Sequence, residues 1–433
     1  MTLAQNQVLR IVTLCALYFA QGVPWGFVTI TFAAWLAKQG LRTEEVAYVG
    51  TISTLPWTFK FLWGPVIDRW GLPSMGRRRP WILFAQAMMG LTLLAIVAVP
   101  DVTRAVTVVA WMIFAHNVFN ALQDVAVDAL GVDLLPASER GRANGLMYGS
   151  KYLGGVVGGA GLATVLEHGG LRVALITQAA LMAGIFLLPL LLRERPGEQL
   201  LPWRTGGETA TAPAAPAQPA DGAVGSLGQV FRDLLRAFSL RSTLLGAALA
   251  LLSSLGVTAL SVIGTVLVVQ KLGWSDADWS RLSGGWGLAA GLAGAVGGGY
   301  IADALGHKRT IALAASLLAL TWLGFAFGQP HWGDRSFIWA VSLAESFLGG
   351  VFNVAVFALV MGLCWPRVAA TQFTSYMALM NLSTVIGYRL AGPLDAALDY
   401  PEIWIVCACL AVLPAAVLPF IDPGQTRRVL GEA

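Results

Sequence analysis

Ionisable side chains stand inside long apolar stretches of the sequence, at Lys60, Asp124, Asp128, Lys151 and Glu345. A charge at the centre of a membrane helix costs at least about 2.5 kcal/mol, so each one needs a partner, a water-filled cavity or a function. The chemistry open to such a set is the binding of a charged solute and the transfer of protons. The sequence contains neither His-Glu-x-x-His nor Gly-x-Ser-x-Gly, and no ligand group at metal spacing. We therefore expect no enzymatic activity, no metal and no cofactor.

The charges of the first half of the chain lie at a similar depth in their helices. Counted at 1.5 Å per residue from the helix ends, Lys60, Asp124, Asp128 and Lys151 fall in one slab. This predicts a compensated cluster of two acids and two lysines, which could bind a solute anion or couple transport to protons. For Asp128 the alternative is that it acts with loop arginines as the latch of a gate.

Two acids are candidates for proton coupling, Asp124 and Glu345. Polar neighbours flank Asp124, which favours contact with a proton or solute. Glu345 is the one acid well inside the second half. It could carry a proton, or it could stay neutral and hydrogen-bonded to a neighbouring helix, and the sequence leaves both open.

Polar residues recur every three or four positions on several of the same segments, which places them on one helix face. We expect these faces to line a central path for a solute. For a single hydroxyl residue the alternative is a bond within its own helix or to a neighbouring helix. The candidates for solute contact are Tyr18, Gln21, Trp25, Asn120, Gln123, Asp124, Lys151 and Asn353.

Hydrophobic residues make up 56% of the 433 positions and charged residues 12%, whereas a soluble chain carries roughly 25% charge. This composition predicts a polytopic membrane protein. The net charge of +4 is small and scattered, which does not favour nucleic-acid binding. Twelve apolar segments are long enough to cross about 30 Å of hydrocarbon as helices. They lie near 10–36, 45–67, 81–99, 104–132, 144–166, 171–192, 242–270, 280–302, 310–328, 336–363, 370–396 and 401–421.

Two helical bundles joined by a linker form the expected domain organisation. The first bundle spans 1–192, the second spans 242–421, and a tail covers 422–433. The linker, 193–241, is rich in Ala, Pro and Gly at its centre, so that part cannot bury enough apolar surface to order itself.

The end of the linker has a different pattern. Phe231, Leu234, Leu235 and Phe238 recur at helical spacing, with arginines between them. This predicts a short amphipathic helix, which lies on the membrane surface or packs on the neighbouring bundle.

A hairpin with a cationic tip occurs twice in the sequence. A glycine and an aspartate four residues apart, Gly64 and Asp68, precede three arginines, and the same spacing returns about 235 residues later at Gly299 and Asp303. The duplication indicates two related halves. We expect gating or structural roles for the hairpin charges and for other basic and acidic residues of these helices. The set is Lys60, Asp68, Arg77, Arg78, Arg79, Asp128, Arg140, Asp303, Lys308 and Arg309.

Lys and Arg concentrate in the terminal segments and in alternate loops, including both hairpin tips. Basic residues favour the cytoplasmic side of a membrane protein. We therefore predict that both termini are cytoplasmic.

The hairpins resemble the loop signature of the major facilitator superfamily. Within it, motifs along the chain resemble the family that joins AmpG-type muropeptide permeases to acetyl-coenzyme A transporters. The motifs are YFAQGVPWG at 18–26, FKFLWGPVIDR at 59–69, GRRRPW at 76–81, NALQDVAVDAL at 120–130, LLPASERGRANG at 134–145 and ATQF at 370–373. By matching position, Gln123, Asp124 and Asp128 carry the family's Q-D-x-x-x-D pattern and Lys60 its intramembrane lysine.

The resemblance implies an all-α fold of two pseudo-symmetric six-helix bundles. It implies a proton-coupled permease of the inner membrane that moves a polar or anionic solute, such as an anhydro-muropeptide, by alternating access. The alternatives are a permease for acetyl-coenzyme A or a siderophore, and a non-transporting sensor on the same fold. The expected partners are the solute, protons and the lipid bilayer, and we expect a monomer.

Overall fold

The computed structural model describes residues 2–70, 72–201 and 227–431, and the side chains of Asp68 and Arg140 lie outside the description. Within these ranges the chain is helical apart from turns and two isolated bridges. The all-α architecture expected from the sequence is confirmed.

The first bundle begins with one long helix that contains a π-helical segment. The elements of this bundle are α1 (Gln7–Gly26), η1 (Phe27–Phe32), α2 (Ala33–Lys38), α3 (Thr43–Thr58), η2 (Lys60–Leu62), α4 (Trp63–Arg69), η3 (Pro73–Met75), α5 (Arg79–Val97), α6 (Val106–Leu134), α7 (Ala137–Val156), η4 (Val157–Gly161) and α8 (Leu162–Leu191).

A short helix, α9 (Leu227–Phe238), precedes the second bundle. The bundle itself and the tail consist of α10 (Arg241–Leu252), α11 (Leu255–Val266), η5 (Leu267–Lys271), α12 (Asp276–Arg281), η6 (Leu282–Gly287), α13 (Leu288–Leu305), α14 (His307–Phe327), η7 (Gln329–His331), α15 (Arg335–Gly362), η8 (Pro366–Val368), α16 (Ala369–Ala397), α17 (Tyr400–Val417), η9 (Leu418–Phe420) and α18 (Gln425–Leu430).

Nine helical stretches of the described residues are long and apolar enough to cross a membrane. One of them, Arg142–Leu191, contains two of the expected segments, because the backbone leaves the helical conformation at Gly170, where φ is 77°. The second expected segment is divided into α3 and α4, and the eleventh is the long helix α16. The remaining stretches account for the other expected segments, so the described part of the chain supplies all twelve expected spans.

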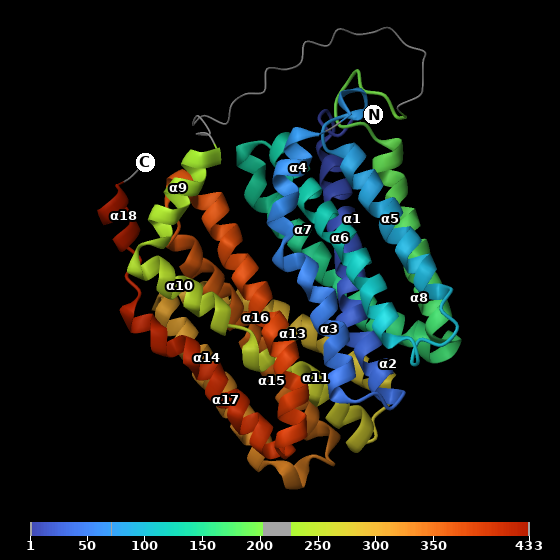
Figure 1. Cartoon of the computed structure of the whole chain (residues 1–433), viewed down its shortest axis with the longest axis vertical. Helices are drawn as coiled ribbons and strands as arrows, with labels where there is room; N and C mark the ends of the chain where they lie inside the picture. The colour runs from blue at the N-terminus through green and yellow to red at the C-terminus, as the bar shows by residue number, and fades with distance from the viewer. Residues whose placement is uncertain (1, 71, 202–226, 432–433) are drawn as a thin grey trace.

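Figure 1 shows the helices as two groups, with the N-terminus, α9 and α18 at one end of the molecule. We call this end the terminal side. The opposite end, where α2 ends and α12 begins, is the far side. Large apolar cores hold each bundle together, and α3 runs beside α16 where the two bundles meet.

Polar contacts join the two bundles on the far side. Lys38 Nζ lies 2.7 Å from an Asp276 carboxylate oxygen. The Gln270 side-chain amide donates to the carbonyl oxygens of Ala37 at 2.8 Å and Leu41 at 2.9 Å. The far side of the interface between the bundles is therefore closed by direct bonds.

Glycines permit the closest helix approaches. A Cβ atom on Gly158 would lie 2.1 Å from the Val23 carbonyl oxygen, so this position must be glycine for η4 to pack against α1. Between the bundles, a Cβ on Gly159 would lie 2.8 Å from the Cα of Gly284. Gly159 and Gly284 lie in π-helical segments, η4 and η6, which meet at the interface.

Candidate functional site

Asp124 on α6 stands at the centre of a charge cluster in the first bundle. Its carboxylate is buried, with one oxygen 2.9 Å from Lys60 Nζ and the other 3.5 Å from Lys151 Nζ. Lys60 comes from η2, which follows α3. Pro56 lies in the last turn of α3, just before the break between α3 and α4. Lys151 comes from α7. Two cations thus compensate one buried acid, which a membrane interior requires.

Asp128 lies one helical turn from Asp124 and has a different partner. It accepts a short hydrogen bond from the hydroxyl of Tyr18 on α1. The depth of the residues in their helices predicts one cluster of both acids and both lysines. In the structure both lysines contact Asp124 directly, and neither is in direct contact with Asp128 among the described ion pairs. Asp128 pairs with a phenol instead, because α1 presents Tyr18 on this side of α6.

The two lysines have unequal surroundings. Lys60 is the more buried, with 16% of its side chain exposed, and it makes the shorter contact to Asp124. Lys151 is 28% exposed and its ammonium lies 5.1 Å from the ring centroid of Trp57. Cation–π contact and a longer ion pair leave Lys151 more available to a third group.

A cavity of about 350 Å³ lies beside Lys151, between the two bundles. Aromatic and amide side chains dominate its wall, and such surfaces suit sugar rings and peptide groups. Asn381 of α16 crosses the interface and donates to the Trp57 carbonyl oxygen at 3.0 Å. The polar and aromatic residues of the wall are Trp25, Thr29, Ser53, Thr54, Trp57, Asn117, Asn120, Tyr148, Lys151 and Tyr152 from the first bundle, with Phe357, Asn381, Thr384 and Tyr388 from the second.

Glu345 lines a second cavity of about 180 Å³, formed mostly by the second bundle with Thr29 and Ile30 of the first, and Thr29 also lines the larger cavity. Hydroxyl groups surround it, and the indole of Trp322 lies beside the carboxyl group. Two of these hydroxyls, Ser261 and Thr265, donate to carbonyl oxygens of their own helix, as single hydroxyls in membrane helices often do. No cation pairs with Glu345 among the described residues, so its carboxyl group faces a cavity without a compensating charge.

Arginines of the first hairpin form ion pairs and hydrogen bonds that hold the terminal side of the first bundle together. Arg78 Nε lies 2.8 Å from an Asp133 carboxylate oxygen, and the buried Arg79 guanidinium donates to carbonyl oxygens of residues 189, 190, 199 and 200. Glu194 accepts the backbone N–H groups of Arg77, Arg78 and Arg79. Burial raises the pKa of Glu194, and these backbone N–H groups oppose the shift.

The other candidates for solute contact lie outside the cavity wall. Gln21 is fully buried, and Gln123 donates to the Leu17 carbonyl oxygen at 3.1 Å. Asn353 is exposed on α15 and is absent from the wall of either cavity. The second hairpin is more open than the first, with Asp303 and Arg309 exposed and Lys308 partly exposed.

Several residues of the cavity wall beside Lys151 are not identified from the sequence. Asn117, Asn381, Thr384 and Tyr388 were not among the candidates, although each is a polar residue within an apolar segment. That signal could have found Asn381, which lies near the middle of the eleventh segment, 370–396. Glu194 was assigned to the linker, and its contact with the hairpin has no signal in the sequence.

Several known proteins similar to this chain are transporters or putative transporters. The family model of the major facilitator superfamily matches residues 14–388. The anhydromuropeptide permease of Escherichia coli strain K12 is 27% identical over 392 residues, which cover 89% of this chain and 73% of the permease. A putative transporter, AmpG 4 of Rickettsia felis, is 22% identical over 430 residues, which cover 95% of this chain and 96% of that protein.

Solved structures of transporters share the fold. The nucleoside transporter NupG superposes with a TM-score of 0.66 at 15% identity, covering 95% of this chain and 98% of NupG. A D-xylose–proton symporter superposes with a TM-score of 0.67 at 14% identity, covering 96% of this chain and 99% of the symporter. The expected fold of two six-helix bundles is confirmed. This chain belongs to the major facilitator superfamily and is a homologue of the AmpG-type muropeptide permeases.

Proposed function

We propose that this protein is a proton-coupled secondary transporter that moves an anionic glycopeptide, such as an anhydro-muropeptide, across the inner membrane. Both termini face the cytoplasm in this proposal, and the monomer is the transporting unit. The observation that carries it is the cavity between the bundles, in which Lys151 stands among aromatic and amide side chains.

The chemistry of the cavity wall suits this solute class. Trp25, Trp57 and Tyr148 offer faces for sugar rings, and the Lys151 ammonium offers a counter-ion for a peptide carboxylate. Asn117 and Asn381 add amide groups that pair with peptide bonds. The likeness to the anhydromuropeptide permease supports the same class.

Acetyl-coenzyme A fits this wall less well. Its phosphate groups would call for several cations, and Lys151 is the one cation among the described residues that line the cavity. We therefore keep acetyl-coenzyme A and siderophores as competitors in the test below.

We infer proton coupling from Lys151, whose ammonium would be shared between Asp124 and a carboxylate of the solute. When a solute carboxylate binds Lys151, Asp124 loses one of the two cations that stabilise its charge. Protonation of Asp124 then becomes easier, so solute and proton bind together. One proton moving down 100 mV supplies about 2.3 kcal/mol, enough for roughly fiftyfold accumulation of a neutral solute. Glu345 is the second candidate for the proton.

The closed far side suggests where the solute leaves. The bonds of Lys38 and Gln270 to the other bundle close the interface there, and Tyr148, on the terminal side of the cavity, is 51% exposed. We assign this arrangement to an inward-facing state. Rocking of the bundles would break the far-side bonds and open the cavity to the other face.

Uptake by proteoliposomes tests the proposal. Radiolabelled anhydro-muropeptide should accumulate under an imposed proton gradient, and a protonophore should abolish the accumulation. Acetyl-coenzyme A and a ferric siderophore are tested as unlabelled competitors and, radiolabelled, as solutes in the same assay. Uptake that survives the protonophore would refute proton coupling, and absence of uptake for all three solutes would favour a sensor.

A further inference from the structure

The helix before the second bundle, α9, packs on one side and leaves the other side open. Its Asp233 is buried and bonds Arg367 of η8 at 3.0 Å, and Ala237 packs with Trp365 and Val368. Phe231, one turn before Leu235, is 62% exposed. The helix is therefore fixed to the loop between α15 and α16 and to the second bundle, where Phe238 packs on Tyr376, and it leaves Phe231 and Arg232 exposed.

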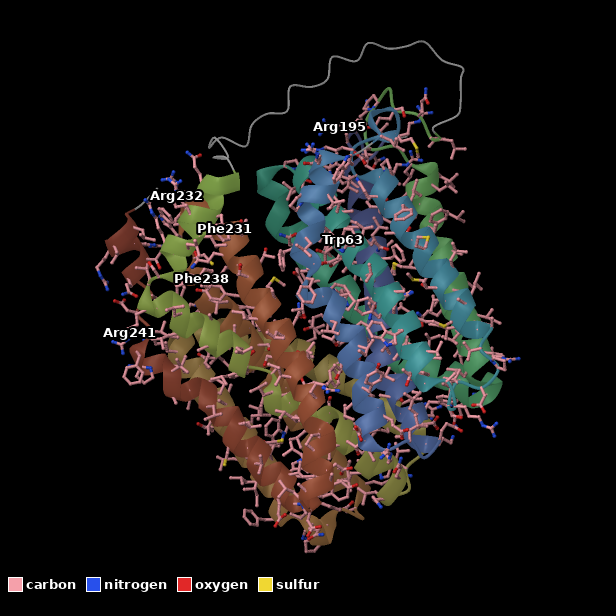
Figure 2. All side chains as sticks on the ribbon, in the orientation of Figure 1. Trp63, Arg195, Phe231, Arg232, Phe238 and Arg241 are labelled. Carbon is pink, nitrogen blue, oxygen red and sulfur yellow. The ribbon has the colours of Figure 1, made fainter. Side chains whose placement is uncertain are left out.

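Arginines gather at the outer edge of this region. Arg232 of α9, Arg241 at the start of α10 and Arg427 of α18 are exposed, and we call these three residues the arginine corner. Figure 2 shows Arg232 and Arg241 along the outer edge of the second bundle, whereas Phe231 and Phe238 lie toward its inner side. Hydrogen bonds between Ser242 and the chain around Gln425 hold α18 against α10, which brings Arg427 to the same corner.

The arginine corner carries uncompensated charge. The carboxylates nearby are engaged elsewhere: Asp233 pairs with Arg236 and Arg367, and Asp422 pairs with Arg428. Within the described ranges, no carboxylate forms an ion pair with a member of the corner. Three guanidinium groups with free donors thus share one edge of the protein.

The corner lies at the boundary of the membrane. Arg241 begins one apolar span, and Phe420 lies near the end of the last one. The Arg241 guanidinium lies 5.6 Å from the ring centroid of Phe420, and that ring is 58% exposed. Leu244, one turn inside Arg241, is 54% exposed. An exposed apolar surface directly beneath exposed arginines is the arrangement expected at the level of lipid head groups.

We propose that the arginine corner is a binding site for an anionic phospholipid. Its phosphate accepts hydrogen bonds from Arg241, while Arg232 and Arg427 add positive charge along the same edge, and its acyl chains lie along Leu244 and Phe420. Guanidinium groups bind phosphate in bidentate geometry, and basic clusters beside a membrane span attract anionic lipid. This inference does not depend on the transported solute or on which face of the membrane the corner occupies.

The test compares lipid binding by two double variants of the full-length protein. Arg232→Gln with Arg241→Gln removes two arginines of the corner. Arg104→Gln with Arg172→Gln is the matched control: it removes the same formal charge from exposed positions on the far side, where Arg104 pairs with Asp101 in the loop before α6 and Arg172 follows the bend of α8 at Gly170. Native mass spectrometry of detergent-purified protein, titrated with phosphatidylglycerol or phosphatidylcholine, measures retention of each lipid.

Each basic residue near an anionic surface favours binding roughly fivefold, so the corner variant should retain phosphatidylglycerol on the order of 25-fold less tightly. The control should match the unmodified protein, and phosphatidylcholine binding should be the same in all three. Added salt should also weaken phosphatidylglycerol retention by the unmodified protein. Equal retention by the corner and control variants, or no preference of the unmodified protein for phosphatidylglycerol, would overturn the proposal.

Discussion

Neutralising Lys60 should mainly lower the stability of the protein, whereas neutralising Lys151 should mainly weaken solute binding. Lys60 makes the shorter, more buried contact to Asp124, at 2.9 Å. Removing one partner of a buried ion pair costs about 3 to 5 kcal/mol, and Lys151 remains near the acid. We expect Lys60→Gln to lower the free energy of unfolding by about 3 kcal/mol. The contact of Lys151 to Asp124 is longer and more exposed to solvent. Lys151→Gln should therefore lower the free energy of unfolding by about 1 kcal/mol and abolish most solute binding.

A double-mutant cycle with Asp124→Asn separates the two lysines. Unfolding in detergent, followed by intrinsic fluorescence, gives the free energy of each single and double variant. Coupling between Lys60 and Asp124 should reach about 2 to 3 kcal/mol, and coupling between Lys151 and Asp124 should stay under about 1 kcal/mol.

Isothermal titration with the solute completes the experiment. Lys60→Gln should keep its affinity once folded, whereas Lys151→Gln should not. If Lys151 shows the stronger coupling to Asp124, or if Lys60→Gln loses solute affinity as severely as Lys151→Gln, the proposed division between the two lysines is wrong.

Three further outcomes follow from contacts outside the cluster. Asp276→Asn weakens the bond to Lys38, so distances between spin labels across the far side should shift toward an open population; an unchanged distribution would contradict the closing role of this bond. Gly159→Ala puts a Cβ against backbone of the other bundle and should cost about 1 to 3 kcal/mol in thermal stability with slowed transport, whereas Gly161→Ala on the same helix, where the new atom has ordinary contacts, should be nearly silent. Glu345→Gln should leave uphill accumulation intact, because Asp124 shares Lys151 with the solute and takes up the proton; loss of accumulation with continued solute exchange would assign the proton to Glu345 instead.

Much of the architecture could be predicted from the sequence, for one physical reason. Lipid offers no hydrogen-bond partner to the backbone, so each apolar segment of sufficient length must form a helix. The repeated hairpin at Asp68 and Asp303 then indicated two related halves. The same energetics makes charges within these segments exceptional, so Asp124, Lys60 and Lys151 are identifiable from the sequence alone.

Only the tertiary structure decided which of these groups meet. The rise of 1.5 Å per residue gives the depth of a side chain, but the rotation of each helix about its axis depends on packing with its neighbours. The rotation of α1 gives Asp128 the hydroxyl of Tyr18 rather than a lysine. The pairing of α3 with α16 brings Asn381 to the cavity wall, and Glu194 reaches the hairpin from a segment far along the chain. The sequence determined the helices and the depth of their charges, and contacts between helices, which depend on long-range packing, determined the site.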